Sequence, residues 1–131
     1  MHRGPVIHIR DPIHGTLPIG LKEIRLIDHF GFQRLRGIKQ LGFADLAFPG
    51  ATHTRYSHSL GAMHVATRVF DCLFGAGDLP DDVRGRFRQT VRLAMLFHDL
   101  GHAPLSHTTE SVMPEVSTLN LGRYAGDNPN R

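Results

Sequence analysis

The sequence predicts an all-α domain that opens with a small β-hairpin. Two β-prone stretches flank a turn-rich segment near the N-terminus, and from residue 21 to about residue 98 apolar residues recur at helical spacing. Breaks rich in glycine and proline separate the helical repeats. The length of 131 residues suits one domain rather than two, and a hydrophobic content of 40% is typical of a globular chain.

The first half of the chain predicts short elements. The expected hairpin pairs residues 6–9 with residues 17–19 across the turn-rich segment Asp11-Pro12-Ile13-His14-Gly15. Apolar spacing then predicts two short helices over residues 21–27 and 32–38, with Gly31 between them. Residues 42–54 break both periods and predict a loop.

Two longer helices are expected in the second half. The first runs from Ser57 to about Phe74, and the second begins after Pro80 with Asp81 or Asp82 as its N-cap and ends before Gly101. Each carries one apolar stripe that we expect to face the core: His58, Ala62, Val65, Val69 and Cys72 on the first, and Val83, Phe87, Val91, Ala94 and His98 on the second.

The remaining chain and its composition limit the classes of protein. A short helix is expected from Leu105 to Met113, and residues 114–131 form a polar tail without a core pattern. No apolar run is long enough for a membrane span and the N-terminus does not resemble a signal peptide, so we expect a soluble, cytoplasmic protein without membrane contact. The single Cys72 excludes a disulfide framework and a thiolate zinc cluster, so any metal would be bound by imidazole and carboxylate groups.

The charged residues favour an anionic partner. Lys and Arg total 15 against 12 Asp and Glu, and nearly all of the cations are Arg, whose guanidinium fits carboxylate and phosphate oxygens. The alternative is that most of these arginines lie on solvated helix faces.

The histidines of the two long helices mark the candidate site. His58 and His98 lie on the predicted apolar stripes, and Asp99 follows His98 directly. Two imidazoles and a carboxylate are ligands of a divalent metal with open positions. A buried Asp needs a cation or another partner, and the only basic residues near Asp99 in the sequence are Arg92 and the histidines. Two interpretations stay open: a metal site, or core histidines with hydrogen bonds of their own.

Four long runs of the sequence closely resemble the HD-domain phosphohydrolases, and within that superfamily the deoxynucleoside triphosphate triphosphohydrolase branch. The resemblance covers roughly residues 9–113, and its runs are DPIHG at residues 11–15, FQRLRGIKQLG at residues 32–42, FPGATHTRYSHSLG at residues 48–61 and FHDLGHAPLSH at residues 97–107.

The resemblance implies a helical bundle that holds a divalent metal such as Mn, Fe, Mg or Zn. By motif position, His58 is the first ligand and His98 with Asp99 is the ligand doublet. The other implied roles are contact with the substrate's phosphates for Arg55, proximity to the nucleotide sugar for Gln40, catalysis and contact with the triphosphate for His102 and His107, support of the catalytic histidine for Glu110, and an activating-nucleotide site for Asp28, Gln33 and Arg36.

The implied reaction converts a deoxynucleoside triphosphate to a deoxynucleoside and tripolyphosphate, in a full-length form that is a homo-oligomer. Because the family places a last Asp ligand downstream of residues 126–131, we expect this chain to be the N-terminal part of a single HD domain, truncated at the C-terminus, with Asp127 a poor substitute. Whether such a fragment is active alone stays open, and the other interpretation of the missing ligand is a short homologue with an altered site. The alternatives are a non-catalytic module for nucleotides or single-stranded nucleic acid, and a phosphodiesterase or 5′-nucleotidase of the same superfamily.

Overall fold

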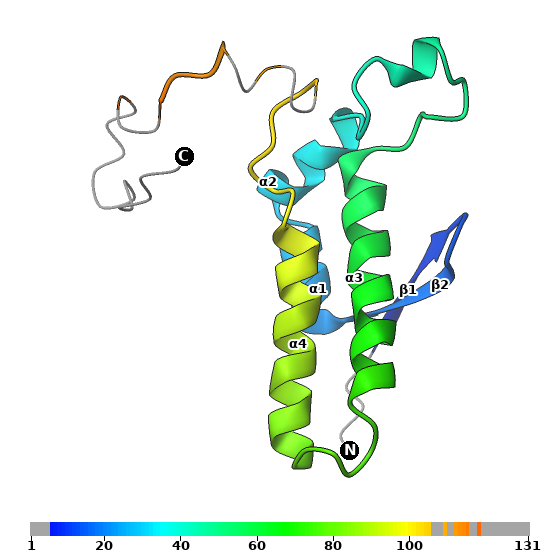
Figure 1. Cartoon of the computed structure of the whole chain (residues 1–131), viewed down its shortest axis with the longest axis vertical. Helices are drawn as coiled ribbons and strands as arrows, with labels where there is room; N and C mark the ends of the chain where they lie inside the picture. Colours follow the sequence, from blue (N-terminus) through cyan, green and yellow to red (C-terminus); the bar gives the residue numbers. More distant parts are fainter. Residues whose placement is uncertain (1–5, 106–108, 110–111, 116–117, 119–131) are drawn as a thin grey trace.

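A computed structural model of the chain describes residues 6–105, 109, 112–115 and 118. Figure 1 shows two long helices, α3 and α4, that run side by side along the molecule, with a β-hairpin beside α3. The mainly helical architecture with an N-terminal hairpin confirms the predicted fold class. The elements are β1 (Val6–Asp11), β2 (Gly15–Gly20), α1 (Leu21–Ile27), α2 (Phe30–Gln33), the 3₁₀ helices η1 (Arg34–Gly37) and η2 (Ala44–Leu46), α3 (Arg55–Leu73) and α4 (Asp81–Phe97).

The hairpin forms where the sequence predicts it. Strands β1 and β2 pair antiparallel from Val6 opposite Gly20 to Asp11 opposite Gly15. The Asp11 carboxylate accepts hydrogen bonds from the amides of Ile13 (2.9 Å) and His14 (2.8 Å), which closes the turn. Gly15 has a φ of 75°, a conformation that favours glycine.

The break between the first two helices lies two residues earlier than expected. Gly31 is inside α2, and the chain turns at Asp28 and His29 instead. The Nδ1 atom of His29 caps α2 by accepting a hydrogen bond from the Gly31 amide at 3.2 Å. Residues 42–54 are a loop as predicted, with the short η2 helix inside it.

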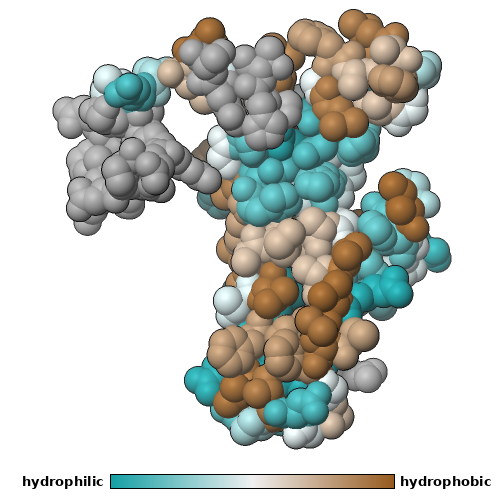
Figure 2. Space-filling model, viewed as in Figure 1, coloured by the Kyte–Doolittle hydropathy of each residue, from teal (hydrophilic) through white to brown (hydrophobic). Residues whose placement is uncertain are grey.

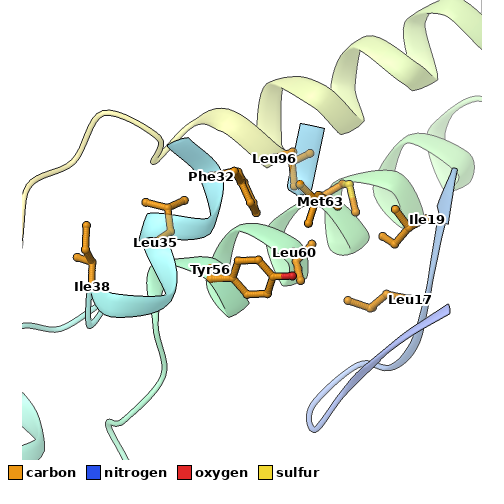
Figure 3. Close-up of a cluster of buried hydrophobic side chains, with 10 residues drawn as sticks. Leu17, Ile19, Phe32, Leu35, Ile38, Tyr56, Leu60, Met63 and Leu96 are labelled. Carbon is orange, nitrogen blue, oxygen red and sulfur yellow. The ribbon is translucent and has the colours of Figure 1, made fainter. Parts of the chain in front are cut away.

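One hydrophobic core joins the hairpin, the short helices and the two long helices (Figure 3). Leu17 and Ile19 of β2 point toward α3, where Leu60 and Met63 lie. Leu96 of α4 belongs to the same cluster and lies beside Met63. Phe32 packs edge-on against Tyr56 and Phe97, with ring centroids 5.5 and 6.1 Å apart. This core fixes the start of α3 relative to the end of α4.

The predicted inward faces of the long helices are wrong. On α3 the buried residues include Leu60, Met63 and Phe70, whereas Val65, Val69 and Cys72 are exposed. On α4 the buried residues are Arg92 and Leu96, whereas Phe87 and Ala94 are exposed. Both helices carry apolar residues on two faces, and the N-terminal segments cover only one. The other face is visible in Figure 2 as an apolar surface over the lower parts of α3 and α4.

A buried ion pair connects the N-terminal segments to both long helices. The Arg92 guanidinium donates to the Glu23 carboxylate at 2.6 and 2.7 Å, to the Thr67 hydroxyl at 2.9 Å and to the Pro18 carbonyl at 3.0 Å. Glu23 also accepts hydrogen bonds from Gln89 and from the Gly20 amide. Arg92 is therefore bound to Glu23. The sequence analysis had considered Arg92 as a partner of Asp99, and the structure does not pair these two residues.

Most of the expected helix over residues 105–113 and most of the polar tail lie outside the described residues. Within the part of the chain that the structure describes, no helix combines the length and the apolar character that crossing a membrane requires.

Candidate metal centre

The site forms where α3 begins and α4 ends, under a hydrophilic area of the surface (Figures 1 and 2). The first turn of α3 is held from two sides. The Thr54 hydroxyl accepts a hydrogen bond from the Ser57 amide, and the Arg55 amide donates to the Ile38 carbonyl at 2.8 Å. As a result α3 begins at Arg55, earlier than its apolar spacing suggests, and His58 lies on its first turn.

His58, His98 and Asp99 converge on one point. The Nε2 atoms of the two histidines are 3.2 Å apart. The Asp99 carboxylate lies 3.7 Å from His58 Nε2 and 3.5 Å from His98 Nε2. One ligand atom from each of the three residues falls within 4.8 Å of the others, which is the spacing of ligands around a single ion.

The hydrogen bond on the other side of His98 favours metal binding. His98 Nδ1 is 2.7 Å from the Met95 carbonyl oxygen, which can only accept, so Nδ1 carries the proton. In the neutral ring Nε2 then presents its lone pair toward His58 and Asp99. Metal-binding histidines are commonly oriented by such a contact. The donor set and its orientation therefore fit a divalent cation.

Asp99 is held in its charged form beside Arg55. Its side chain is 7% exposed, and the Arg55 Nη1 atom, on a side chain only 2% exposed, lies 2.8 Å from its Oδ2 atom. Burial alone would raise the pKa of Asp99, but the charges of His98 and Arg55 outweigh burial and lower it. Burial lowers the pKa of His58, although the Asp99 charge acts in the opposite direction. Both shifts favour the forms that bind a metal, a carboxylate and a neutral imidazole.

The other predicted site residues are only partly placed. His102 lies beside the three candidate ligands, with its Nε2 atom 3.6 Å from Asp99 Oδ1. The Gln40 amide donates to the His53 carbonyl at 3.0 Å, and its buried Oε1 atom has no hydrogen bond from any residue that the structure describes. His107, Glu110 and Asp127 lie outside the described residues.

The proposed activating-nucleotide residues form local contacts with one another and with the first turn of α3. Arg36 Nε donates to Gln33 Oε1 at 2.7 Å, and its guanidinium stacks 3.7 Å from the centre of the Tyr56 ring. Among the described residues, no hydrogen bond or ion pair joins the Asp28 side chain to this pair.

A groove of about 1040 Å³ opens beside His58. The hairpin turn and the loop residues Gly50, Thr52 and His53 line its end near the site, and apolar residues of α3 and α4 line the rest. His58 lies at the edge of this groove, and His58 and His98 are partly exposed rather than in the core, with 38% and 32% of their side chains accessible. The sequence analysis placed both histidines in the core because it assigned the wrong apolar face of each long helix to the interior.

Two contacts of the site were missed by the sequence interpretation. Arg55 and Asp99 are 44 positions apart, and no local pattern connects them. Arg34 donates hydrogen bonds to the carbonyls of Leu100 and His102 from a different segment, again without a signal in the spacing.

Comparison with known proteins defines the class. The family model described as HD domain matches residues 55–125, more than half of the chain. This match includes the start of α3 and the His98-Asp99 pair. The chain therefore belongs to the HD-domain family.

The chain is also similar to individual proteins of known sequence or structure. The chain is 45% identical over 102 residues to the human deoxynucleoside triphosphate triphosphohydrolase SAMHD1, covering 76% of this chain and 16% of that protein. It is 43% identical over 102 residues to an uncharacterized protein of Methanocaldococcus jannaschii, covering 78% and 20%. The crystal structure of a hypothetical protein from Aquifex aeolicus matches with a TM-score of 0.70 and 41% identity, covering 94% of this chain and 29% of that one. The chain spans about one fifth or less of the length of the two curated relatives.

Proposed function

We propose that this chain supplies the metal-binding core of a phosphohydrolase that converts deoxynucleoside triphosphates to deoxynucleosides and tripolyphosphate. The observation that carries the proposal is the convergence of His58, His98 and Asp99 from two helices. The name of the human relative, a deoxynucleoside triphosphate triphosphohydrolase, supports the substrate class.

The ligand residues have distinct tasks in this proposal. His58 and His98 would bind a divalent cation through Nε2, and Asp99 through its carboxylate. When bound, such a cation polarises a phosphate oxygen and activates water for attack on phosphorus. Arg55 keeps the Asp99 carboxylate charged and oriented, and it adds a positive charge where the phosphates would lie.

Residues around the ligands would bind and protonate the substrate. His102 is close enough to Asp99 to hold a phosphate oxygen or pass a proton to the leaving oxygen. The unused acceptor of Gln40 is suited to a sugar hydroxyl. His107 and Glu110 complete the proposed catalytic set on the strength of the family resemblance.

The experiment measures bound metal and dNTP hydrolysis for the 131-residue chain and for any longer natural chain that contains it. His98→Ala is expected to reduce metal binding and tripolyphosphate release by about a hundredfold or more, since it removes a ligand directly. His29→Ala is the control, because His29 caps α2 away from the site.

Wild-type activity in His98→Ala would overturn the proposal. Hydrolysis of phosphodiesters or nucleoside monophosphates without tripolyphosphate release would instead assign the alternative reaction of the same superfamily.

A further inference from the structure

The turn that follows α4 carries two residues of the proposed site. Helix α4 ends at Phe97, and the chain continues through Asp99 to His102 in a turn closed by hydrogen bonds from the Leu100 amide to Phe97 (3.0 Å) and from the His102 amide to Asp99 (3.1 Å). Leu100 and His102 lie beyond the last turn of α4, so their carbonyls are not paired in its hydrogen-bond ladder. Both accept hydrogen bonds from a side chain of another segment.

Arg34, the first residue of η1, supplies the donor for two carbonyls of this turn. Its Nη2 atom donates to the Leu100 carbonyl and, at 3.0 Å, to the His102 carbonyl, over separations of 66 and 68 positions. The two carbonyls flank Gly101, the residue of the turn with no side chain to hold it. The guanidinium also places a positive charge at the C-terminal end of α4, where the helix dipole favours it.

The segment that carries Arg34 is itself fixed. Its neighbours Phe32 and Leu35 are both buried, and Phe32 packs against Phe97, the last residue of α4. Arg34 therefore starts from an ordered backbone, so its hydrogen bonds can determine the position of the turn.

We propose that Arg34 is a positioning residue of the metal site: it holds the turn over residues 98–102 in the conformation in which Asp99 lies beside both His58 and His102. This inference rests on the proposed function, because the position of the turn affects activity only if its residues bind the metal and the phosphates. Arg34 acts through the two carbonyls and touches neither metal nor substrate.

The test compares Arg34→Gln and Arg34→Lys with the wild-type chain. The first readout is amide hydrogen exchange of residues 98–102 in the metal-free protein, and the second is Mn²⁺ affinity by calorimetry. Arg34→Gln is expected to speed exchange and to weaken Mn²⁺ binding about tenfold, the usual size of effects from residues that orient metal ligands. Arg34→Lys keeps the charge and one donor group, so it should restore part of both readouts.

Arg25→Gln is the matched control, since Arg25 is exposed on α1 and its side chain makes no hydrogen bond or ion pair within the described part of the chain. Exchange and affinity within twofold of wild type in Arg34→Gln would overturn the inference, as would an equal loss in Arg25→Gln. If Arg34→Gln does not fold, Arg34→Lys decides: weaker binding than wild type supports the role, and unchanged binding overturns it. Failure of the wild-type chain to bind Mn²⁺ would instead refute the proposed function.

Discussion

The candidate site depends on which ring nitrogen of each histidine carries the proton. His98 donates from Nδ1 to the Met95 carbonyl, three residues earlier in the chain, and so presents Nε2 to the other ligands. His29 has the opposite arrangement, because its Nδ1 accepts the Gly31 amide. The sequence singles out the three candidate ligands, and the structure brings them together. The pairing of Asp99 with Arg55 could not, since it depends on how two distant helix ends meet.

We predict that the neutral forms of these two histidines differ in their tautomer. In alkaline solution, ¹⁵N NMR of the metal-free protein should show His98 protonated at Nδ1 and His29 protonated at Nε2. Added Zn²⁺ should shift the Nε2 signal of His98 and leave His29 unchanged. An Nε2–H tautomer at His98 would contradict the assignment of that atom as a ligand.

At the scale of whole elements, the long helices show what apolar spacing can and cannot predict. The sequence placed α3 and α4 to within a few residues, because Thr54, Pro80 and the apolar repeats mark their limits. It assigned the wrong faces, since each helix has two apolar sides. The side that is buried was decided by Leu17, Phe32 and Leu35 from other elements, together with the salt bridge between Glu23 and Arg92.

Breaking this salt bridge on one side should destabilise the fold. Arg92→Met leaves the Glu23 carboxylate buried without its main partner, and we expect a loss of about 3–5 kcal/mol in the free energy of unfolding. The double variant Glu23→Leu with Arg92→Met should recover much of that loss, because no uncompensated charge remains. Urea denaturation measures both effects.

Arg86→Ala serves as the control for this series. Arg86 pairs with Asp82 on the surface of α4, with both side chains about three-quarters exposed, so its removal should cost about 0.5 kcal/mol or less. Equal losses in Arg86→Ala and Arg92→Met would show that the buried network has no special importance.

For the molecule as a whole, ionisable groups whose pKa is lowered in the folded protein determine how the free energy of unfolding changes with pH. Burial would raise the pKa of Glu23, but Arg92 and its other hydrogen bonds lower it below the ordinary value of 4.5. Hydrogen bonds from Arg88 lower the pKa of Asp71 below 3.8. Burial lowers the pKa of His64 below 6.5. In each case the unfolded chain binds protons at a higher pH than the folded protein does.

We therefore expect the free energy of unfolding to be highest near neutral pH, to decline slowly below pH 6.5 and to fall more steeply below pH 4.5. The contribution of Glu23 is fully present above 4.5 and is lost as the pH falls through its lowered pKa in the folded state. Urea midpoints between pH 7 and pH 3 measure this profile. Glu23→Gln should be less stable at pH 7 and flatter below pH 5, and a slope equal to that of wild type would contradict the assignment.

The same network has a consequence for the order of events during synthesis. Arg92 lies 69 positions after Glu23 and 74 after Pro18, so the N-terminal hairpin and α1 leave the ribosome long before their partner. A two-stranded hairpin is marginal by itself, and long loops must close before such distant contacts contribute. The hairpin and α1 gain their stability only once α4 has been made. Folding of this domain is thus expected to finish late and in one cooperative step, with the candidate ligands brought together in that same step.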